Sequence, residues 1–204
     1  MNHLARLLVL LAVSSLAAQS LKNEDLGISI TNKPQLFVAE ILDVKKMDLA
    51  NRKAVFLNRG RVMERVKLSH GGGTRIYRFD DGFSENTEVK LGWQMPLARE
   101  LWLAYYEWGW YMASSAHSGA VQVFELREGK VFIIQQIDFD MHHGGHAVGA
   151  SFDPKRKILT VRSVPFDSPK GRCCPIYINT VTFRWDGQRF VRISAKRAPI
   201  SKQD

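Results

Sequence analysis

Three tight-turn signals, each placed between two apolar runs, limit this chain to a fold built from hairpins. They are Phe79-Asp80-Asp81-Gly82-Phe83, Leu126-Arg127-Glu128-Gly129-Lys130 and Trp185-Asp186-Gly187-Gln188. An acidic residue followed by glycine between alternating apolar residues is a strong hairpin signal. A fourth turn, Phe152-Asp153-Pro154-Lys155, joins the runs 148–152 and 158–164. The sequence therefore predicts a mainly β, β-rich α+β fold, an antiparallel sheet or sandwich of successive hairpins with little helix.

The last of these hairpins allows a prediction of its register. A three-residue loop, Trp185-Asp186-Gly187, pairs Val181 with Val191 and keeps the apolar residues of both strands on one face. That loop is a type I turn with Gly187 left-handed at a bulge. It leaves Arg192 and Lys196 on the solvent side of the strand.

The hairpin around Glu128-Gly129 has two apolar faces. Simple alternation places Val121, Val123, Val131 and Ile133 on one face, and Phe124, Phe132 and Ile134 on the other. Strands that are apolar on both faces are typical of a buried sheet. We expect these two strands to be central and covered on both sides.

The first half of the chain is less regular. Residues 34–44 and 54–57 are predicted to pair around the segment 48–51, and Ser69–Thr74 to form a flexible loop. Leu97–Met112 fits both periodicities. Pro96 and the helical spacing after it predict a short helical turn near 97–102, and the dense aromatic residues predict a strand beyond it.

The N-terminus has the organisation of a secretory signal. A short start with Arg6 precedes the apolar run 7–13, and small residues allow cleavage near Ala17 or Ser20. The run is too short to span a bilayer, and no later stretch is long and apolar enough. We expect a secreted or periplasmic protein without a transmembrane segment in the mature chain; a retained anchor or a buried helix is the alternative.

The chain remaining after cleavage is long enough for one domain with a sizeable core. The predicted organisation is a signal peptide over residues 1–17, a lead segment over 18–33, a single β-rich domain over 34–197 and a disordered tail over 198–204.

The positive charge is concentrated near the C-terminus. The net charge is +9; residues 1–153 hold seventeen charges of each sign, whereas the rest holds twelve Lys or Arg against three Asp. A basic face favours anionic partners, and Arg184, Arg192 and Lys196 are the candidate anion-binding residues for a lipid surface or polymer. A plain solvated face is the alternative. No nucleic acid is expected, because aromatic and basic residues do not form a base-binding motif.

The two cysteines, Cys173 and Cys174, are neighbours and precede Pro175. Their Cα atoms lie about 3.8 Å apart across a trans peptide, below the usual disulfide range. Three interpretations stay open: a strained disulfide acting as a local clip, two free or intermolecularly bonded thiols, and a metal or redox role.

His142, His143 and His146 form the best candidate metal site, in which His142 and His146 supply two ligands and His117, Asp138 or Asp140 supplies a third. Imidazole binds zinc, copper or nickel, but the spacing matches no established zinc motif. A polar loop without metal is the alternative. No cofactor is otherwise expected, since no catalytic constellation with a local signature is found and no catalytic residue is assigned.

The C-terminal part resembles a set of exported bacterial proteins. The residues that carry this likeness are Cys173-Cys174-Pro175, the run 181–187 ending in Arg184-Trp185-Asp186-Gly187, and the segment 119–140. They are similar to those of mycobacterial LppP/LprE-type lipoproteins over residues 118–192. The resemblance implies an exported β-rich fold and no particular activity. This chain lacks the lipid-acceptor cysteine of those lipoproteins.

These observations predict a non-enzymatic binding or structural module of the cell envelope or secreted fraction. Two other functions remain: a metal-binding protein or metalloenzyme using His142–His146, and a protein that binds anionic lipid or polymer through its basic C-terminal hairpin.

Overall fold

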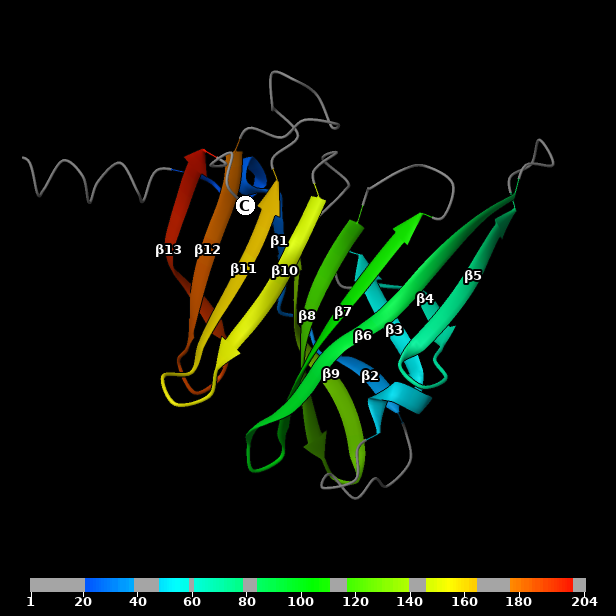
Figure 1. The fold of residues 1–204 in the computed structure, drawn as a ribbon. Helices are drawn as coiled ribbons and strands as arrows, with labels where there is room; N and C mark the ends of the chain where they lie inside the picture. Colours follow the sequence, from blue (N-terminus) through cyan, green and yellow to red (C-terminus); the bar gives the residue numbers. More distant parts are fainter. Residues whose placement is uncertain are drawn as a thin grey trace, which may run out of the picture.

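The computed structural model describes residues 21–38, 48–58, 61–78, 84–110, 117–139, 146–164 and 177–199 (Figure 1). In this part of the chain nearly every element is a strand, as the sequence predicts. The strands are β1 Ile28–Thr31, β2 Gln35–Val38, β3 Lys53–Asn58, β4 Arg61–Lys67, β5 Gly72–Arg78, β6 Ser84–Ala98, β7 Leu101–Trp110, β8 His117–Arg127, β9 Lys130–Phe139, β10 His146–Asp153, β11 Ile158–Val164, β12 Tyr177–Trp185 and β13 Phe190–Pro199, with short 3-10 turns η1 Glu24–Leu26 and η3 Leu49–Asn51.

The described residues form three sheets. The large sheet has the order β1-β9-β8-β7-β6-β5, and β2 also pairs with β9; a second sheet has the order β10-β11-β12-β13, and β3 pairs with β4. Every strand pair is antiparallel. Figure 1 shows the four-stranded sheet on one side of the large sheet and the β3–β4 pair on the other. Hairpin connections keep most successive strands in the same sheet. The sheets stack because each has an apolar face to bury.

The large sheet has a hydrophobic core on each face. One core joins it to the four-stranded sheet and includes Val121, Val123 and Phe139 from the large sheet and Val181 and Phe183 from the other. The second core lies on the opposite face and joins the large sheet to β2, η3 and the β3–β4 pair. Burial on both faces confirms the prediction that β8 and β9 are central. Each fully buried aliphatic side chain contributes about 1.5–3 kcal/mol relative to exposure.

The faces of β8 and β9 are not those that simple alternation predicts. Phe124 pairs with Ile133, whereas Val123 pairs with Gln135, so Ile134 is an extra residue in β9. This bulge reverses the alternation of one strand relative to the other. Phe124, Val131 and Ile133 therefore share the second core, and Val121 and Val123 lie in the first.

One buried polar contact joins the large sheet to the β3–β4 pair, and another polar contact lies within β7. The buried Gln122 side chain donates from Nε2 to the Val55 carbonyl oxygen at 2.6 Å and to Gln136 Oε1 at 2.7 Å. The Tyr105 hydroxyl donates to Glu107 Oε1 at 2.6 Å. Burial, followed by the interaction with Glu107, raises the pKa of Tyr105 far above its ordinary value, so the hydroxyl remains a donor.

The turns at Glu128-Gly129 and Asp153-Pro154 form where the sequence predicts them. Glu128 and Gly129 both have positive φ, 51° and 71°, and close the β8–β9 hairpin. Asp153 caps the β10–β11 turn, its Oδ1 accepting from the backbone N–H groups of Lys155 and Arg156. The strands that flank residues 79–83 pair as β5 and β6, although those five residues lie outside the described part.

Three local predictions in the first half are wrong. The described part of the run 34–44, which is β2, does not pair with 54–57: β2 pairs with β9, and β3 pairs with β4. Gly72–Thr74 belong to strand β5 and not to a flexible loop. No helical turn forms near 97–102, because β6 runs to Ala98 and β7 starts at Leu101. In each case strand pairing overrides the local propensity.

The β12–β13 register also differs from the prediction. Val181 pairs with Ala195, Trp185 pairs with Phe190, and Ile193 is an extra residue in a bulge. The loop consequently covers Asp186–Arg189, and Val191 and Ile193 are exposed at 41% and 44%. The predicted face was wrong because the bulge lies inside the strand and not at the turn.

Both ends of the described chain join the fold. β1 lies within the predicted lead segment and pairs with β9, while Leu26 just before it is fully buried. β13 continues to Pro199, two residues into the predicted tail. No helix among the described residues has the length and apolar character needed to cross a membrane.

Candidate ligand-binding cleft

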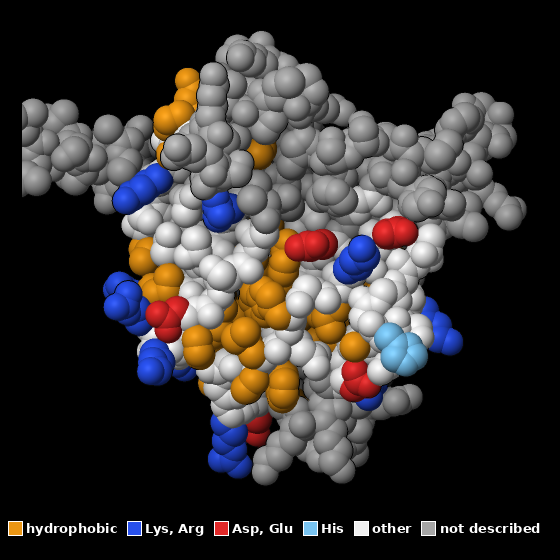
Figure 2. All heavy atoms as spheres, viewed as in Figure 1, with side chains coloured by type: hydrophobic (Ala, Val, Ile, Leu, Met, Phe, Trp, Pro, Cys, Tyr) orange, Lys and Arg blue, Asp and Glu red, His pale blue; other side chains and the backbone are white. Residues whose placement is uncertain are grey.

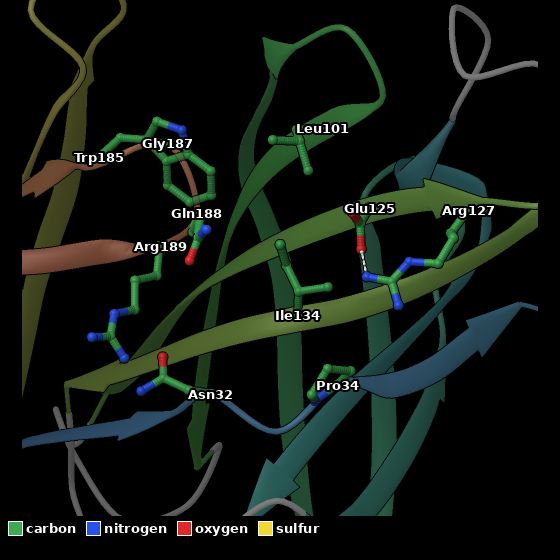
Figure 3. Close-up of a pocket in the computed structure, with 10 residues that line it drawn as sticks. All are labelled: Asn32, Pro34, Leu101, Glu125, Arg127, Ile134, Trp185, Gly187, Gln188 and Arg189. Carbon is green, nitrogen blue, oxygen red and sulfur yellow. Dashed lines mark hydrogen bonds and ion pairs between the residues drawn. The ribbon is translucent and has the colours of Figure 1, made fainter.

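A cleft of about 380 Å³ opens where the β12–β13 turn faces the large sheet (Figure 3). Its lining comes from the β1–β2 connection, from β7, β8 and β9, and from the β12–β13 turn. The lining residues are Asn32, Pro34, Leu101, Glu125, Arg127, Ile134, Trp185, Gly187, Gln188 and Arg189. The volume is at the lower end of the range of small-molecule sites, about 300–1,000 Å³.

The buried Gln135 side chain connects elements that surround this cleft. Its Nε2 donates to Asn32 Oδ1 at 2.9 Å and to the Phe190 carbonyl oxygen at 3.0 Å. Its Oε1 accepts from the Phe190 backbone N–H at 2.8 Å. One amide therefore joins the β1–β2 connection, β9 and the start of β13, which sets the separation of the two sheets at this point.

The apolar part of the lining consists of Trp185, Ile134 and Leu101. Trp185 packs edge-on against Phe190, with ring centroids 5.2 Å apart, and keeps 8% of its surface exposed. Ile134 reaches the cleft because it is the bulged residue of β9. In Figure 3 Trp185 and Arg189 lie on one side of the opening, Glu125 and Arg127 lie on the other, and Leu101 and Ile134 lie between them.

Each charged residue of the cleft lining lies close to a side chain of opposite charge. Glu125 and Arg127 lie two residues apart on β8 and form an ion pair. The Arg127 guanidinium also lies 5.6 Å from the centre of the Phe132 ring. Arg189 Nε lies 4.0 Å from Asp186 Oδ2. Because each arginine has a carboxylate, the cleft offers hydrogen-bonding groups with little net charge.

The β12–β13 turn has a defined shape. Asp186 Oδ1 accepts from the backbone N–H groups of Gln188 at 2.8 Å and Arg189 at 2.9 Å. These two bonds, in that order, lower the pKa of Asp186 below its ordinary value. Gly187 has a φ of 108°, which favours glycine. The turn thereby places Gln188 and Arg189 at the rim.

The predicted metal site lies mostly outside the described residues. His142, His143 and Asp140 are outside them, and His117 and His146 are placed by their backbones alone, at the starts of β8 and β10. Asp138, in β9, accepts from Gln136 Nε2 at 2.7 Å. Among the described residues no three His, Cys, Asp or Glu side chains come close enough to hold a metal. Cys173 and Cys174 also lie outside the described part.

The predicted anion-binding residues lie on opposite faces of the four-stranded sheet. Arg184 and Lys196 are exposed on the face turned away from the large sheet. Arg192 pairs with Phe183, is half-buried, and donates to the Leu21 carbonyl oxygen at 2.8 Å and to Asn23 Oδ1 at 2.7 Å. Arg192 is therefore not on the solvent side, because the bulge at Ile193 turns it inward.

Sequence reasoning did not find the cleft. Asn32, Glu125 and Arg189 are far apart in the chain, and none belongs to a recognisable motif. The nearest signal was the predicted Trp185-Asp186-Gly187 turn, which forms one rim.

No protein-family model, no curated protein and no solved structure matches this chain.

Proposed function

We propose that this chain is an exported, non-enzymatic binding module that holds a small neutral, polyhydroxylated ligand in the cleft. The observation that carries the proposal is the pairing of an apolar strip, Trp185, Ile134 and Leu101, with charges that are already neutralised. A sugar ring has an apolar face and a rim of hydroxyl groups, which such a lining fits.

The polar groups suit hydroxyl recognition. Planar amides, carboxylates and guanidinium groups can donate to or accept from adjacent hydroxyls, and Asn32, Gln188 and the Glu125–Arg127 pair supply them. Of the lining residues, Glu125 is the sole carboxylate, and Arg127 neutralises it. This lining favours binding over hydrolysis, which commonly uses two carboxylates. Export is supported by the signal-like N-terminal sequence.

A panel of immobilised neutral mono- and disaccharides tests the proposal, followed by titration calorimetry on any hit. We expect Arg189→Met to weaken binding at least tenfold, since it removes a donor from the rim. Arg156→Met is the matched control, because Arg156 also follows an aspartate by three residues in a turn and lies 3.8 Å from it. Absence of binding at millimolar concentration, or equal loss in both variants, would refute the proposal. Binding limited to acidic sugars would refute its charge argument.

A further inference from the structure

The outward face of the four-stranded sheet carries a row of hydroxyl groups that crosses all its strands. Ser151 pairs with Thr160, Thr160 with Thr182, and Thr182 with Ser194. The alternate residues of the central strands, Leu159, Val161, Val181 and Phe183, are buried against the large sheet. The hydroxyl row therefore points away from the core.

Three cations surround this row. Arg162 and Lys196 lie in the neighbouring row, on either side of Thr180, and Arg184 lies on the opposite side of the hydroxyls. Arg162, Arg184 and Lys196 are all exposed. We call this set, with the four hydroxyl residues, the hydroxyl-basic face. Figure 2 shows Lys and Arg side chains on the part of the molecule formed by the four-stranded sheet.

Four cations elsewhere in the described chain lie beside a carboxylate, whereas the cations of this face, like the exposed Lys53, Lys67 and Lys130, do not. Lys90, Arg127, Arg156 and Arg189 each lie within 4.0 Å of a carboxylate oxygen. Within the described ranges, Arg162, Arg184 and Lys196 have no such partner. The acidic residue at the end of the face, Asp153, uses Oδ1 to cap its own turn and pairs with Arg156. The positive charge of the hydroxyl-basic face is thus uncompensated.

The spacing of the cations follows from sheet geometry. Arg162 and Lys196 are two strands apart, about 10 Å, and Arg184 lies about 13 Å along β12 from Thr180. An extended chain with repeated negative charges can contact all three cations while its hydroxyls meet the serine and threonine row. A single small anion cannot reach all three.

We propose that the hydroxyl-basic face binds a linear acidic polysaccharide. The hydroxyl row suits a sugar polymer, because each hydroxyl can both donate and accept. A membrane-binding surface would surround the cations with large apolar side chains. Here Val191 and Ile158 lie beside Arg184, whereas the other two cations flank Thr180 next to the hydroxyl row, and anionic vesicles are therefore included in the test. Single-stranded nucleic acid would need aromatic stacking platforms, which the described residues of this face do not supply. This inference is independent of the cleft.

Retention on immobilised heparin and polygalacturonate, with dextran as the neutral probe, tests the proposal. The triple variant Arg162→Gln/Arg184→Gln/Lys196→Gln should weaken binding to the acidic polymers at least tenfold. Added salt should strongly weaken the binding of the native protein to the same polymers. The control triple, Lys53→Gln/Lys67→Gln/Lys130→Gln, changes the net charge equally at exposed sites on other strands and should leave retention unchanged. Equal loss in both triples would mean attraction by net charge alone and would overturn the proposal.

A second variant separates hydroxyl recognition from charge. Thr160→Val/Thr182→Val keeps the β-branched shape and the cations but removes two hydroxyls from the row. Its retention should fall several-fold with the same dependence on salt. Unchanged retention would overturn the proposal, as would tighter binding to anionic vesicles or single-stranded DNA than to the acidic polysaccharides.

Discussion

Asp186 shows how a single side chain determines the shape of a functional rim. Its carboxylate accepts two backbone N–H groups and orients Gln188 and Arg189 over the cleft. The same bonds favour the charged form of the carboxyl and lower its pKa. The residue therefore links the pH dependence of stability to the geometry of the cleft.

The pH dependence of the Asp186 contribution has a definite sign. A carboxyl whose pKa is lower in the folded state stabilises the fold above its unfolded pKa, and that contribution is lost as the pH falls through the folded value. Asp186→Asn should therefore lower the free energy of unfolding near pH 7, and the difference from the native protein should shrink below about pH 4. Urea unfolding at several pH values measures this. A difference that stays constant down to pH 2 would contradict the assignment.

At the scale of elements, a missing side chain on β8 allows two aromatic rings from the neighbouring strands to lie over Gly119. A Cβ at Gly119 would lie 2.5 Å from Phe139 Cζ and 3.1 Å from Tyr105 Cε2. Those two rings stack with centroids 5.7 Å apart at an angle of 19°. Because Phe139 and Tyr105 are both in the first core, neither ring has space to move.

Gly119→Ala should accordingly destabilise the protein by about 1–3 kcal/mol through overpacking. Gly72→Ala is the matched control in another strand of the same sheet, because its Cβ would approach nothing closer than the Ser69 carbonyl oxygen at 3.9 Å. We expect the control to change stability by less than about 0.5 kcal/mol. Denaturant unfolding measures the free energy of unfolding of both variants. Equal values would contradict the overpacking and show that the strands around Gly119 relax to accept the added Cβ.

At the scale of the whole molecule, the large sheet and the four-stranded sheet depend on one another. They share the first core, and Gln135 joins the β1–β2 connection, β9 and β13 behind the cleft. Neither sheet can bury its apolar face alone, so we expect the described part of the chain to unfold as one cooperative unit.

Gln135→Met tests this connection. It preserves the length of the side chain but leaves the buried Phe190 N–H and carbonyl without their partner, at a cost of about 1–3 kcal/mol for each unsatisfied group. We expect the denaturant concentration at the midpoint of unfolding to fall. The transition should remain single, with circular dichroism and tryptophan fluorescence changing together. Gln188→Met, at an exposed position, is the control. Separate transitions of the two signals would show that the sheets unfold independently.

The extent of successful prediction differs between local and long-range features. The turns around Glu128-Gly129 and Asp153-Pro154 were predictable because they depend on the chemistry of a few adjacent residues. The apolar character of β8 and β9 on both faces likewise identified them as central. The cleft was not predictable, because Asn32, Glu125 and Arg189 become neighbours through strand order alone.

The amino-acid sequence by itself determined that this chain forms β-strands joined by hairpins, since period-two alternation and turn preferences are local properties. The tertiary structure alone decided the partner of β2, the inward position of Arg192 and the meeting of Arg162 with Arg184 and Lys196. Strand order decides the partner of β2 and the row of Arg162 and Lys196. The bulge at Ile193 turns Arg192 inward, as the bulge at Ile134 changes the faces of β9. One extra residue moves every later side chain to the opposite face, and its cost or benefit depends on packing against distant strands.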